Sequence, residues 1–234
     1  MINSFYRKQV SAIFIVFSLV AIPNVFAEVE STQWLLEKDN SGIQIFLGKA
    51  DKGTRLTYKA ETQVKATLPQ LFNALMDTSV TTEWLYNLKS IKLLESQAGY
   101  ETYFYVVYST PWPVKDVSAV LRATWSYEKD QGLLKNSTVS MASEQYPSGE
   151  KYSDDGFMHI PLIETHNNFQ QVDSENIKLT FEVTIDHGYL LPNLIVDTAS
   201  VDALYETLKQ LQGIDYKSYD ENNRLSELEK IKGN

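Results

Sequence analysis

Three histidines, His159, His166 and His187, are the residues of this sequence with the widest chemical range. A histidine can serve as a general base or bind a metal, but a metal site needs three or four convergent ligands. His159 and His166 lie on strand-like segments that we expect to meet in a hairpin, and His187 follows Asp186 in a turn. No diagnostic metal-ligand spacing occurs among them, so we expect neither a metal nor a cofactor.

The serines that could act as nucleophiles are Ser109, Ser118 and Ser143. None lies in the strand-to-helix elbow that exposes a catalytic serine in hydrolases, and no glycine-rich phosphate loop occurs. The sequence therefore contains no catalytic constellation, and we expect that the protein is not an enzyme. The alternative is an enzyme that acts on a hydrophobic substrate inside a cavity, in the manner of a cyclase or hydratase.

Residues 1–27 have the layout of a secretory signal peptide. Arg7 and Lys8 precede an apolar run over residues 10–22, and Ala27 ends the segment as a small residue at a cleavage site. The run is shorter than the ~20 residues that a membrane-spanning helix needs. We expect cleavage after Ala27 and a periplasmic or secreted location, with an uncleaved N-terminal anchor as the alternative.

The composition excludes one class of partner and one kind of stabilisation. The chain carries 30 acidic against 21 basic residues, a formal net charge of −9. Nucleic-acid binding depends on clustered Lys and Arg, so we expect no nucleic-acid partner. There is no cysteine, so the core must hold the fold without disulfides. The sequence does not set the oligomeric state.

Alternation of apolar and polar residues predicts that strands make up most of the chain. Leu56, Tyr58 and Ala60 alternate with polar residues, and Leu179 and Phe181 do the same. We expect strands near residues 43–47, 55–62, 90–95, 100–108, 117–127, 133–142, 156–163, 166–172 and 178–186. Short polar links between successive strands favour hairpins, and hence one antiparallel sheet.

Helix signals occur after the second of these strands and again after the last one. Thr67 as N-cap and Pro69 in the first turn begin a helix with an apolar stripe, and a short helical piece follows over residues 80–88. A longer helix begins at Pro192 and ends before Gly213. The tail beyond it is polar, and we expect disorder there rather than a frayed helix.

A sheet of about nine strands curls through its own twist. One long helix laid across the concave side does not fill that side. The inner residues therefore either pack shut or enclose a cavity. The sequence thus predicts an α+β fold, with a curved antiparallel sheet and a long C-terminal helix over a hydrophobic cavity.

Four short motifs follow one another between residues 33 and 212. They are Trp34-Leu35-Leu36 before Gly42-Ile43, Glu83-Trp84, Pro111-Trp112-Pro113-Val114, and Asp186-x-Gly188-x-x-Leu191-Pro192. Their order and spacing resemble the START family, the StAR-related lipid-transfer domains. The resemblance implies a START/Bet v 1-like helix-grip fold with a tunnel for one lipid or other hydrophobic molecule. It also implies that Trp34-Leu35-Leu36 belongs to an opening helix.

One departure from the family pattern concerns charge in the tunnel. Lipid-binding members often direct an arginine inward at the position that aligns with Ala123, whereas the arginine here is Arg122. A one-residue offset turns a side chain to the opposite face of a strand. We therefore expect Arg122 to point outward, which favours a neutral or weakly polar ligand over one with a phosphate headgroup.

The predicted cavity lining combines the apolar face of the 117–125 strand with aromatic and apolar residues of neighbouring elements. The lining residues are Tyr103, Tyr105, Val117, Ala119, Leu121, Ala123, Trp125, Phe181, Val183, Ile195, Thr198 and Tyr205. The predicted gate is the loop before the last helix, with Gly188 as hinge and Tyr189, Leu190 and Leu191 as apolar tips in transient contact with a membrane. The alternative is that these tips pack the helix start against the core.

These expectations divide the chain into a signal peptide at 1–27, a START-like lipid-binding domain at 28–213 and a polar C-terminal tail at 214–234. The predicted function is to bind, and to transfer, a lipid or other hydrophobic small molecule in an extracytoplasmic compartment. An enzyme in the same cavity is the first alternative. An interaction domain without a ligand is the second, and it requires a closed core.

Overall fold

The computed structural model describes residues 33–48, 55–97, 100–110, 115–142, 156–159, 161–186, 192–219, 225 and 228. The chain divides into two compact units, Met1–Ser31 and Thr32–Asn234, and all described residues belong to the second. Three features of the sequence analysis lie outside the described residues: the predicted cleavage site at Ala27, the Pro111-Trp112-Pro113-Val114 motif, and the predicted gate residues Gly188, Tyr189, Leu190 and Leu191.

Strands dominate the described part of the chain. The elements are β1 (Trp34–Asn40), β2 (Ile43–Gly48), β3 (Arg55–Lys65), α1 (Leu68–Met76), α2 (Thr81–Trp84), β4 (Leu88–Gln97), β5 (Glu101–Tyr108), β6 (Val117–Glu128), η1 (Lys129–Gln131), β7 (Leu133–Met141), β8 (Met158–His159), β9 (Leu162–Gln171), β10 (Asn176–Asp186), α3 (Asn193–Gln212) and η3 (Tyr216–Ser218). Of these, η1 and η3 are short 3₁₀ helices.

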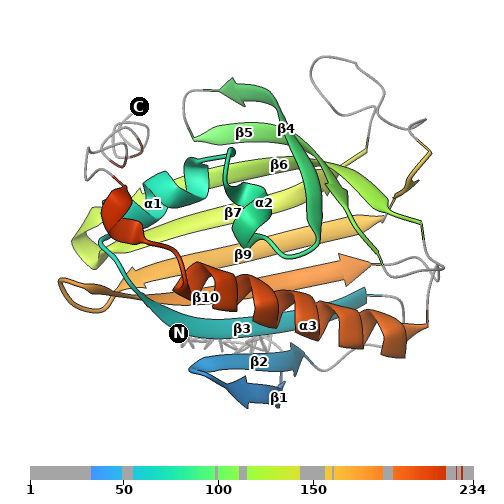
Figure 1. Cartoon of the computed structure of the whole chain (residues 1–234), viewed down its shortest axis with the longest axis horizontal. Helices are drawn as coiled ribbons and strands as arrows, with labels where there is room; N and C mark the ends of the chain where they lie inside the picture. The colour runs from blue at the N-terminus through green and yellow to red at the C-terminus, as the bar shows by residue number, and fades with distance from the viewer. Residues whose placement is uncertain are drawn as a thin grey trace, which may run out of the picture. The chain divides into compact units, whose positions relative to one another are not determined.

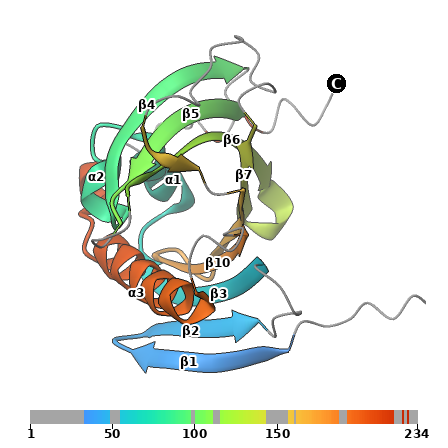
Figure 2. The same ribbon diagram turned by 90° about the vertical axis from the view of Figure 1, so that its right-hand side faces the viewer.

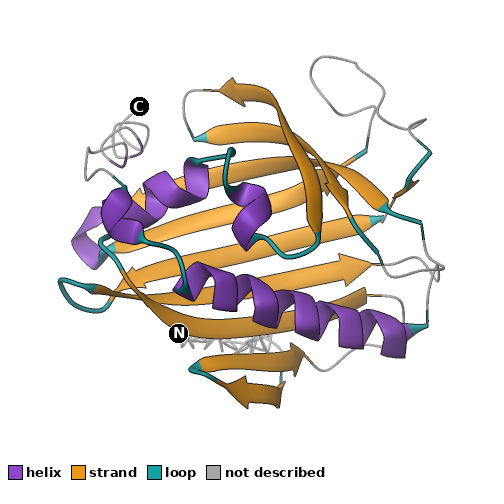
Figure 3. Ribbon diagram, in the orientation of Figure 1, coloured by secondary structure: helices purple, strands orange, loops and turns teal. Residues whose placement is uncertain are grey.

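The strands form one curved sheet in the order β1-β2-β3-β10-β9-β7-β6-β5-β4 (Figure 1). All its pairings are antiparallel except that of β8, which runs parallel to β6. The helices α1, α2 and α3 lie on the same side of the sheet, within its curve (Figures 2 and 3). The predicted α+β architecture, a curved sheet with a long C-terminal helix, is confirmed.

Local signals explain where the helices begin and how they pack. Thr67 N donates to Gln70 Oε1 at 3.0 Å and Gln70 N donates to Thr67 Oγ1 at 3.5 Å, which makes a capping box at the start of α1. Phe72 of α1 is buried in the main apolar cluster. Leu208 and Leu211 bury one side of α3 against the same cluster, and α3 packs on β3 and β2.

Trp34–Asn40 is a strand, which corrects the opening helix implied by the family resemblance. Ser41 and Gly42 have φ angles of 54° and 73°, as a two-residue type I′ turn requires. The turn places Asn40 opposite Ile43, and the pairing of β1 with β2 continues back to Trp34. Hairpin pairing therefore fixes this segment as an edge strand.

The residues 162–171 form one strand, β9, where the sequence predicted two strands at 156–163 and 166–172. Its pairing with β7 and β10 runs uninterrupted through the expected break. The predicted hairpin of His159 and His166 is wrong, because β8 pairs with β6 and not with β9. His159 lies beside Ser118 of β6, at 3.2 Å between Nδ1 and Oγ.

The tail after α3 is packed on the core at the positions that the structure describes. Tyr216 is buried and its Oη donates to Leu211 O at 2.9 Å. Leu225 and Leu228 are also buried, within the main apolar cluster. The prediction of disorder is therefore wrong for these residues, because a few apolar side chains anchor the tail to the core.

Candidate functional site

The concave face of the sheet is the side that faces the helices, and cross-strand pairing assigns residues to it (Figure 2). Trp125 packs edge-on against Phe72 of α1, with ring centroids 5.2 Å apart. Side chains alternate along a strand, so the odd-numbered residues of β6 share this face. These are the predicted residues Val117, Ala119, Leu121, Ala123 and Trp125.

Arg122 lies on the opposite, convex face of β6 and is exposed. Its cross-strand neighbours there are Tyr103 of β5 and Val139 of β7. The prediction that Arg122 points outward is therefore confirmed. The concave face of β6 carries no cation.

Phe181, Val183 and Tyr205, three further predicted lining residues, lie on the helix side of the sheet or on the helix itself. Phe181 contacts Phe169 with centroids 5.8 Å apart, and Val183 follows two positions later on the same face of β10. Tyr205 of α3 is buried beside β1, with Lys38 Nζ 4.0 Å from its ring centroid. Their contact with a ligand stays a prediction.

Tyr103 and Tyr105 are on the convex face, which corrects their place in the predicted lining. They pair with Arg122 and Val120 of β6, and Tyr103 Oη donates to Glu101 Oε1 at 2.6 Å. The concave positions of β5 belong to Phe104 and its alternate neighbours. Because aromatic residues and valines occupy both faces of β5, alternation in the sequence did not show which residues point inward.

Ile195 and Thr198 do not belong to the buried side of α3, which is a second correction. Ile195 is 51% exposed, and Thr198 is exposed with its Oγ1 donating to Leu194 O within the helix. Val196 is buried instead. Asp197 Oδ1 accepts a hydrogen bond from the buried Tyr58 Oη at 2.8 Å, and this contact orients the start of the helix.

Buried apolar side chains on the concave side form three clusters, and the half-buried Val201 and Leu204 of α3 pack against both the first and the third. The largest includes Leu134 near α1, the second is centred on Val106 of β5, and the third joins Leu56 of β3 to α3. A main core with smaller satellite clusters is the usual arrangement in a domain. The second cluster, on β5 and β6, shares none of its named residues with the other two.

Polar side chains occupy part of the same face, and the sequence analysis missed them. They are Thr102, Asn136, Thr138, Thr165 and Asn167, called the polar strip from here on. Asn136 pairs with Asn167 and Thr138 with Thr165. Their period-two spacing on β7 and β9 could have shown that they share one face of the sheet. The predicted break within β9 hid this, because it left the alternation across residues 163–166 undefined.

The amides of the polar strip form a short hydrogen-bonded chain. Asn136 Nδ2 donates to Thr124 O at 3.3 Å, and Asn167 Nδ2 donates to Asn136 Oδ1 at 3.0 Å. Thr138 Oγ1 also donates to Asn136 Oδ1, at 3.2 Å. Asn167 Oδ1 and Thr102 Oγ1 are buried and have no hydrogen-bond partner within the described part of the chain. The described part of the protein thus supplies hydrogen-bond partners for only some of the polar atoms of the strip.

The concave face is electrically neutral along β6, β7, β9 and β10, where every described inward residue is apolar or carries a hydroxyl or an amide. Burial raises the pKa of Tyr108, on the concave side of β5, to about 12. Burial, and then the hydrogen bond to Asp197, raises the pKa of Tyr58 above its usual 10.0. Both phenols therefore stay neutral at physiological pH.

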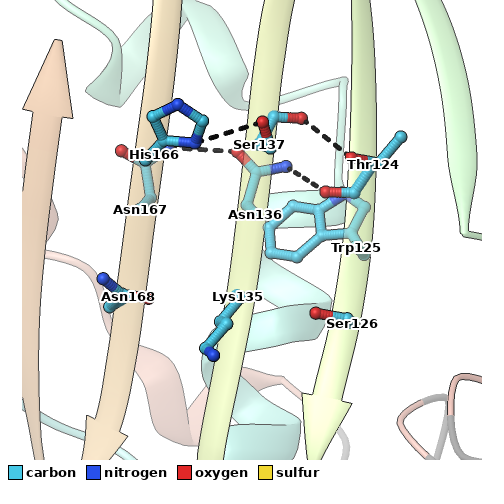
Figure 4. Close-up of a pocket in the computed structure, with 9 residues that line it drawn as sticks. All are labelled: Thr124, Trp125, Ser126, Lys135, Asn136, Ser137, His166, Asn167 and Asn168. Atoms are coloured by element: carbon cyan, nitrogen blue, oxygen red, sulfur yellow. Dashed lines mark hydrogen bonds between the residues drawn. The ribbon is translucent and has the colours of Figure 1, made fainter. Parts of the chain in front are cut away.

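A pocket of about 360 Å³ lies against β6, β7 and β9 (Figure 4). Three consecutive residues of each strand line it: Thr124, Trp125, Ser126, Lys135, Asn136, Ser137, His166, Asn167 and Asn168. Apart from Trp125, Asn136 and Asn167, these are convex-face positions, and its lining includes no residue of the described helices. The pocket therefore opens on the outer side of the sheet.

Ser137 and His166, which line this pocket, form a row with Glu164 on the convex face. Ser137 Oγ is 3.3 Å from His166 Nδ1, and Glu164 Oε1 is 3.1 Å from His166 Nε2. A nucleophilic serine also needs free N–H donors nearby to stabilise an oxyanion. Ser137 lies within β7, which is paired on both sides, so the described backbone offers no such site beside it.

The described ranges contain no group of three or more His, Cys, Asp or Glu that could hold a metal ion. Within the same ranges, no helix combines the length and apolar character needed to cross a membrane.

Comparison with known proteins shows the fold. No known family model matches the chain. It is 23% identical to an uncharacterised protein of Pseudomonas aeruginosa, over 82% of this chain and 91% of that one. A STAR-related lipid transfer protein from Xanthomonas axonopodis matches with a TM-score of 0.67 and 21% identity, over 77% of this chain and 97% of that one. Human StAR-related lipid transfer protein 5 matches with a TM-score of 0.66 and 14% identity, over 80% of this chain and 88% of that one. The chain has the helix-grip fold of START domains.

Proposed function

We propose that the protein binds one lipid or other hydrophobic molecule between the concave face and α3, and transfers it through an extracytoplasmic compartment. The observation that carries this proposal is the concave face itself, which along β6, β7, β9 and β10 carries apolar, hydroxyl and amide side chains and no charge. The fold shared with the Xanthomonas lipid transfer protein supports it.

The energetics of the hydrophobic effect explain why such a carrier is needed. A lipid chain of about 15 methylenes resists transfer into water by roughly 12 kcal/mol, at ~0.8 kcal/mol for each CH₂. An apolar binding site recovers a similar amount, so exchange between a bilayer and the protein is nearly balanced. Gly188 and the apolar residues 189–191 are proposed as the gate that opens during transient contact with a membrane.

The extracytoplasmic location rests on the signal-peptide pattern of residues 1–27. Secretion would place the carrier in an aqueous compartment, where transfer of a free lipid through water is opposed by the hydrophobic effect. The enzyme alternative would require ionisable side chains convergent on the bound molecule. Along β6, β7, β9 and β10, the described concave-face side chains are apolar, hydroxyl or amide, which favours a carrier.

The direct test of transfer uses the chain from residue 28 onward with donor and acceptor vesicles of phosphatidylcholine. The donor contains a self-quenched fluorescent lipid, with a hydroxyl, amide or phosphate headgroup in parallel samples. We expect transfer of at least one neutral probe at a rate proportional to protein concentration. Rates equal to the protein-free rate for every probe would contradict the proposal.

A further inference from the structure

Asn167 Oδ1, on the concave face of β9, is an acceptor that has no hydrogen-bond partner among the residues that the structure describes. Asn167 is 9% exposed, and the oxygen itself is buried. A buried acceptor without a partner costs free energy, because water satisfied it before folding. Such an atom on the proposed binding face marks a position for a donor that arrives with the ligand.

The hydrogen-bond network fixes which atom of Asn167 is free. Thr124 O can only accept, so the Asn136 group 3.3 Å from it must be the NH₂ (Figure 4). Asn136 Oδ1 then faces Asn167 and requires a donor, which Asn167 Nδ2 supplies at 3.0 Å. The same Nδ2 also reaches Thr165 Oγ1, at 3.4 Å. The remaining atom of Asn167 is therefore the carbonyl oxygen, an acceptor.

The surroundings of the amide pair are apolar and uncharged. Cross-strand pairing places Trp125, Asn136, Asn167 and Phe181 in one row across β6, β7, β9 and β10. The two amides thus lie between two aromatic residues. A carbonyl oxygen in this setting repels phosphate and carboxylate oxygens, and the described concave positions of these strands provide no carboxylate to pair with a buried ammonium.

Asp197, the carboxylate that α3 brings to the concave side, is already engaged by Tyr58 Oη at 2.8 Å. Arg122, the cation on β6, is on the convex face. From these contacts, and resting on the proposed function, we propose that the ligand is an uncharged lipid whose polar end carries a hydroxyl or amide N–H that donates to Asn167 Oδ1.

The test compares two probes that differ only in the donor. Hexadecan-1-ol carries a hydroxyl proton, and 1-methoxyhexadecane replaces that proton with a methyl group. Each displaces the neutral dye Nile red from ligand-stripped protein at pH 7.5, followed by fluorescence, with ionised hexadecanoate as the charged comparison. We expect the alcohol to bind about tenfold tighter than the ether, as one net hydrogen bond implies, and tighter than hexadecanoate.

Asn167→Leu removes the acceptor and keeps a similar volume, so it should reduce the preference for alcohol over ether to within about twofold. Asn168→Leu, the neighbour on the convex face of β9, is the matched control and should keep the preference. Thermal unfolding verifies that both variants fold, and the wild-type comparison of the two probes needs no variant.

Equal binding of alcohol and ether by the wild type would overturn this inference and leave the proposed function intact. A preference that persists in Asn167→Leu would overturn the role of Asn167. Failure of the dye and of every probe to bind would overturn the proposed function and, with it, the inference.

Discussion

The strands β6, β7 and β9 carry two rows of polar contacts that lie one residue apart and on opposite faces. On the convex face, Thr124, Ser137 and His166 face water and line a pocket. On the concave face, Asn136 and Asn167 are 7% and 9% exposed. The residue types are alike, but their environments differ.

Burial, rather than residue type, therefore decides how much free energy a polar group loses when it lacks a hydrogen-bond partner. A convex-face hydroxyl or imidazole exchanges freely between protein and water partners, so an incomplete row there costs little. A buried amide on the concave face cannot exchange its partner for bulk water, so a hydrogen-bond partner that it lacks has to come from the protein or from a ligand. The Ser–His–Glu row is therefore a surface feature, whereas the amide pair bears on what the protein binds.

The largest contrast between the faces is expected from adjacent tryptophan substitutions on β6. Ala123→Trp fills space on the concave face equivalent to several ligand methylenes at ~0.8 kcal/mol each, so we expect lipid affinity to fall by at least about 100-fold. Arg122→Trp adds the same ring on the convex face and should leave affinity unchanged. Fluorescent-lipid titration measures both.

Unfolding of Ala123→Trp would show that the interior is already filled, because a tightly packed core does not accept an added indole ring. Equal affinity in the two variants would place the ligand elsewhere. Either result would remove the functional difference between the two faces.

A smaller contrast concerns stability. Asn136→Ala removes the acceptor used by Asn167 Nδ2 and Thr138 Oγ1, so we expect a loss of about 1–3 kcal/mol in the free energy of unfolding. Ser137→Ala, the next residue on β7, should change it by no more than about 0.5 kcal/mol. Urea denaturation measures both variants, and equal losses would contradict the distinction.

The smallest contrast is in pH dependence. Burial alone would raise the pKa of Glu61, on the convex face of β3, but Lys178 at 2.9 Å and Lys59 at 3.5 Å lower it below its usual 4.5. The folded state therefore holds this carboxylate charged more strongly than the unfolded state does. Its contribution is present above pH 4.5 and is lost as the pH falls through the lowered value.

Glu61→Gln should therefore cost less than about 1 kcal/mol at neutral pH, because the ion pairs are partly exposed, and close to nothing in strong acid. The cost of Asn136→Ala should be the same at both pH values, since no amide ionises. Urea denaturation at pH 7 and pH 3 gives the comparison. A cost of Glu61→Gln that does not change with pH would contradict the role assigned to the two lysines.

The sequence predicted the architecture and the inward face of β6 because both depend on clear alternation. Val117 to Trp125 alternates with Arg122 as the charged marker of the outer face. On β5, tyrosines and valines occupy both faces, so only its pairing with β6 shows that Tyr103 and Tyr105 point outward. Alternation shows which residues of a strand point inward where one face of the strand is exposed to solvent. It does not show this where both faces are covered.

Longer-range contacts account for the other differences. Ile195 was predicted on the inward side of α3, but the hydrogen bond of Asp197 to Tyr58 of β3 brings Asp197 to the buried side, and Ile195 is exposed. The polar strip was missed because its members come from strands far apart in the sequence, and their shared face depends on register. Neither contact can be read from local spacing.

The sharpest test of whether the concave face holds a hydrophobic molecule is the native mass spectrum of the chain from residue 28 onward, purified without detergent. We expect a species heavier than the denatured polypeptide by the mass of one uncharged lipid, present in the wild type and Arg122→Trp and absent in Ala123→Trp. Repeated spectra of the wild type that show only the polypeptide mass, before and after incubation with lipid vesicles, would contradict it.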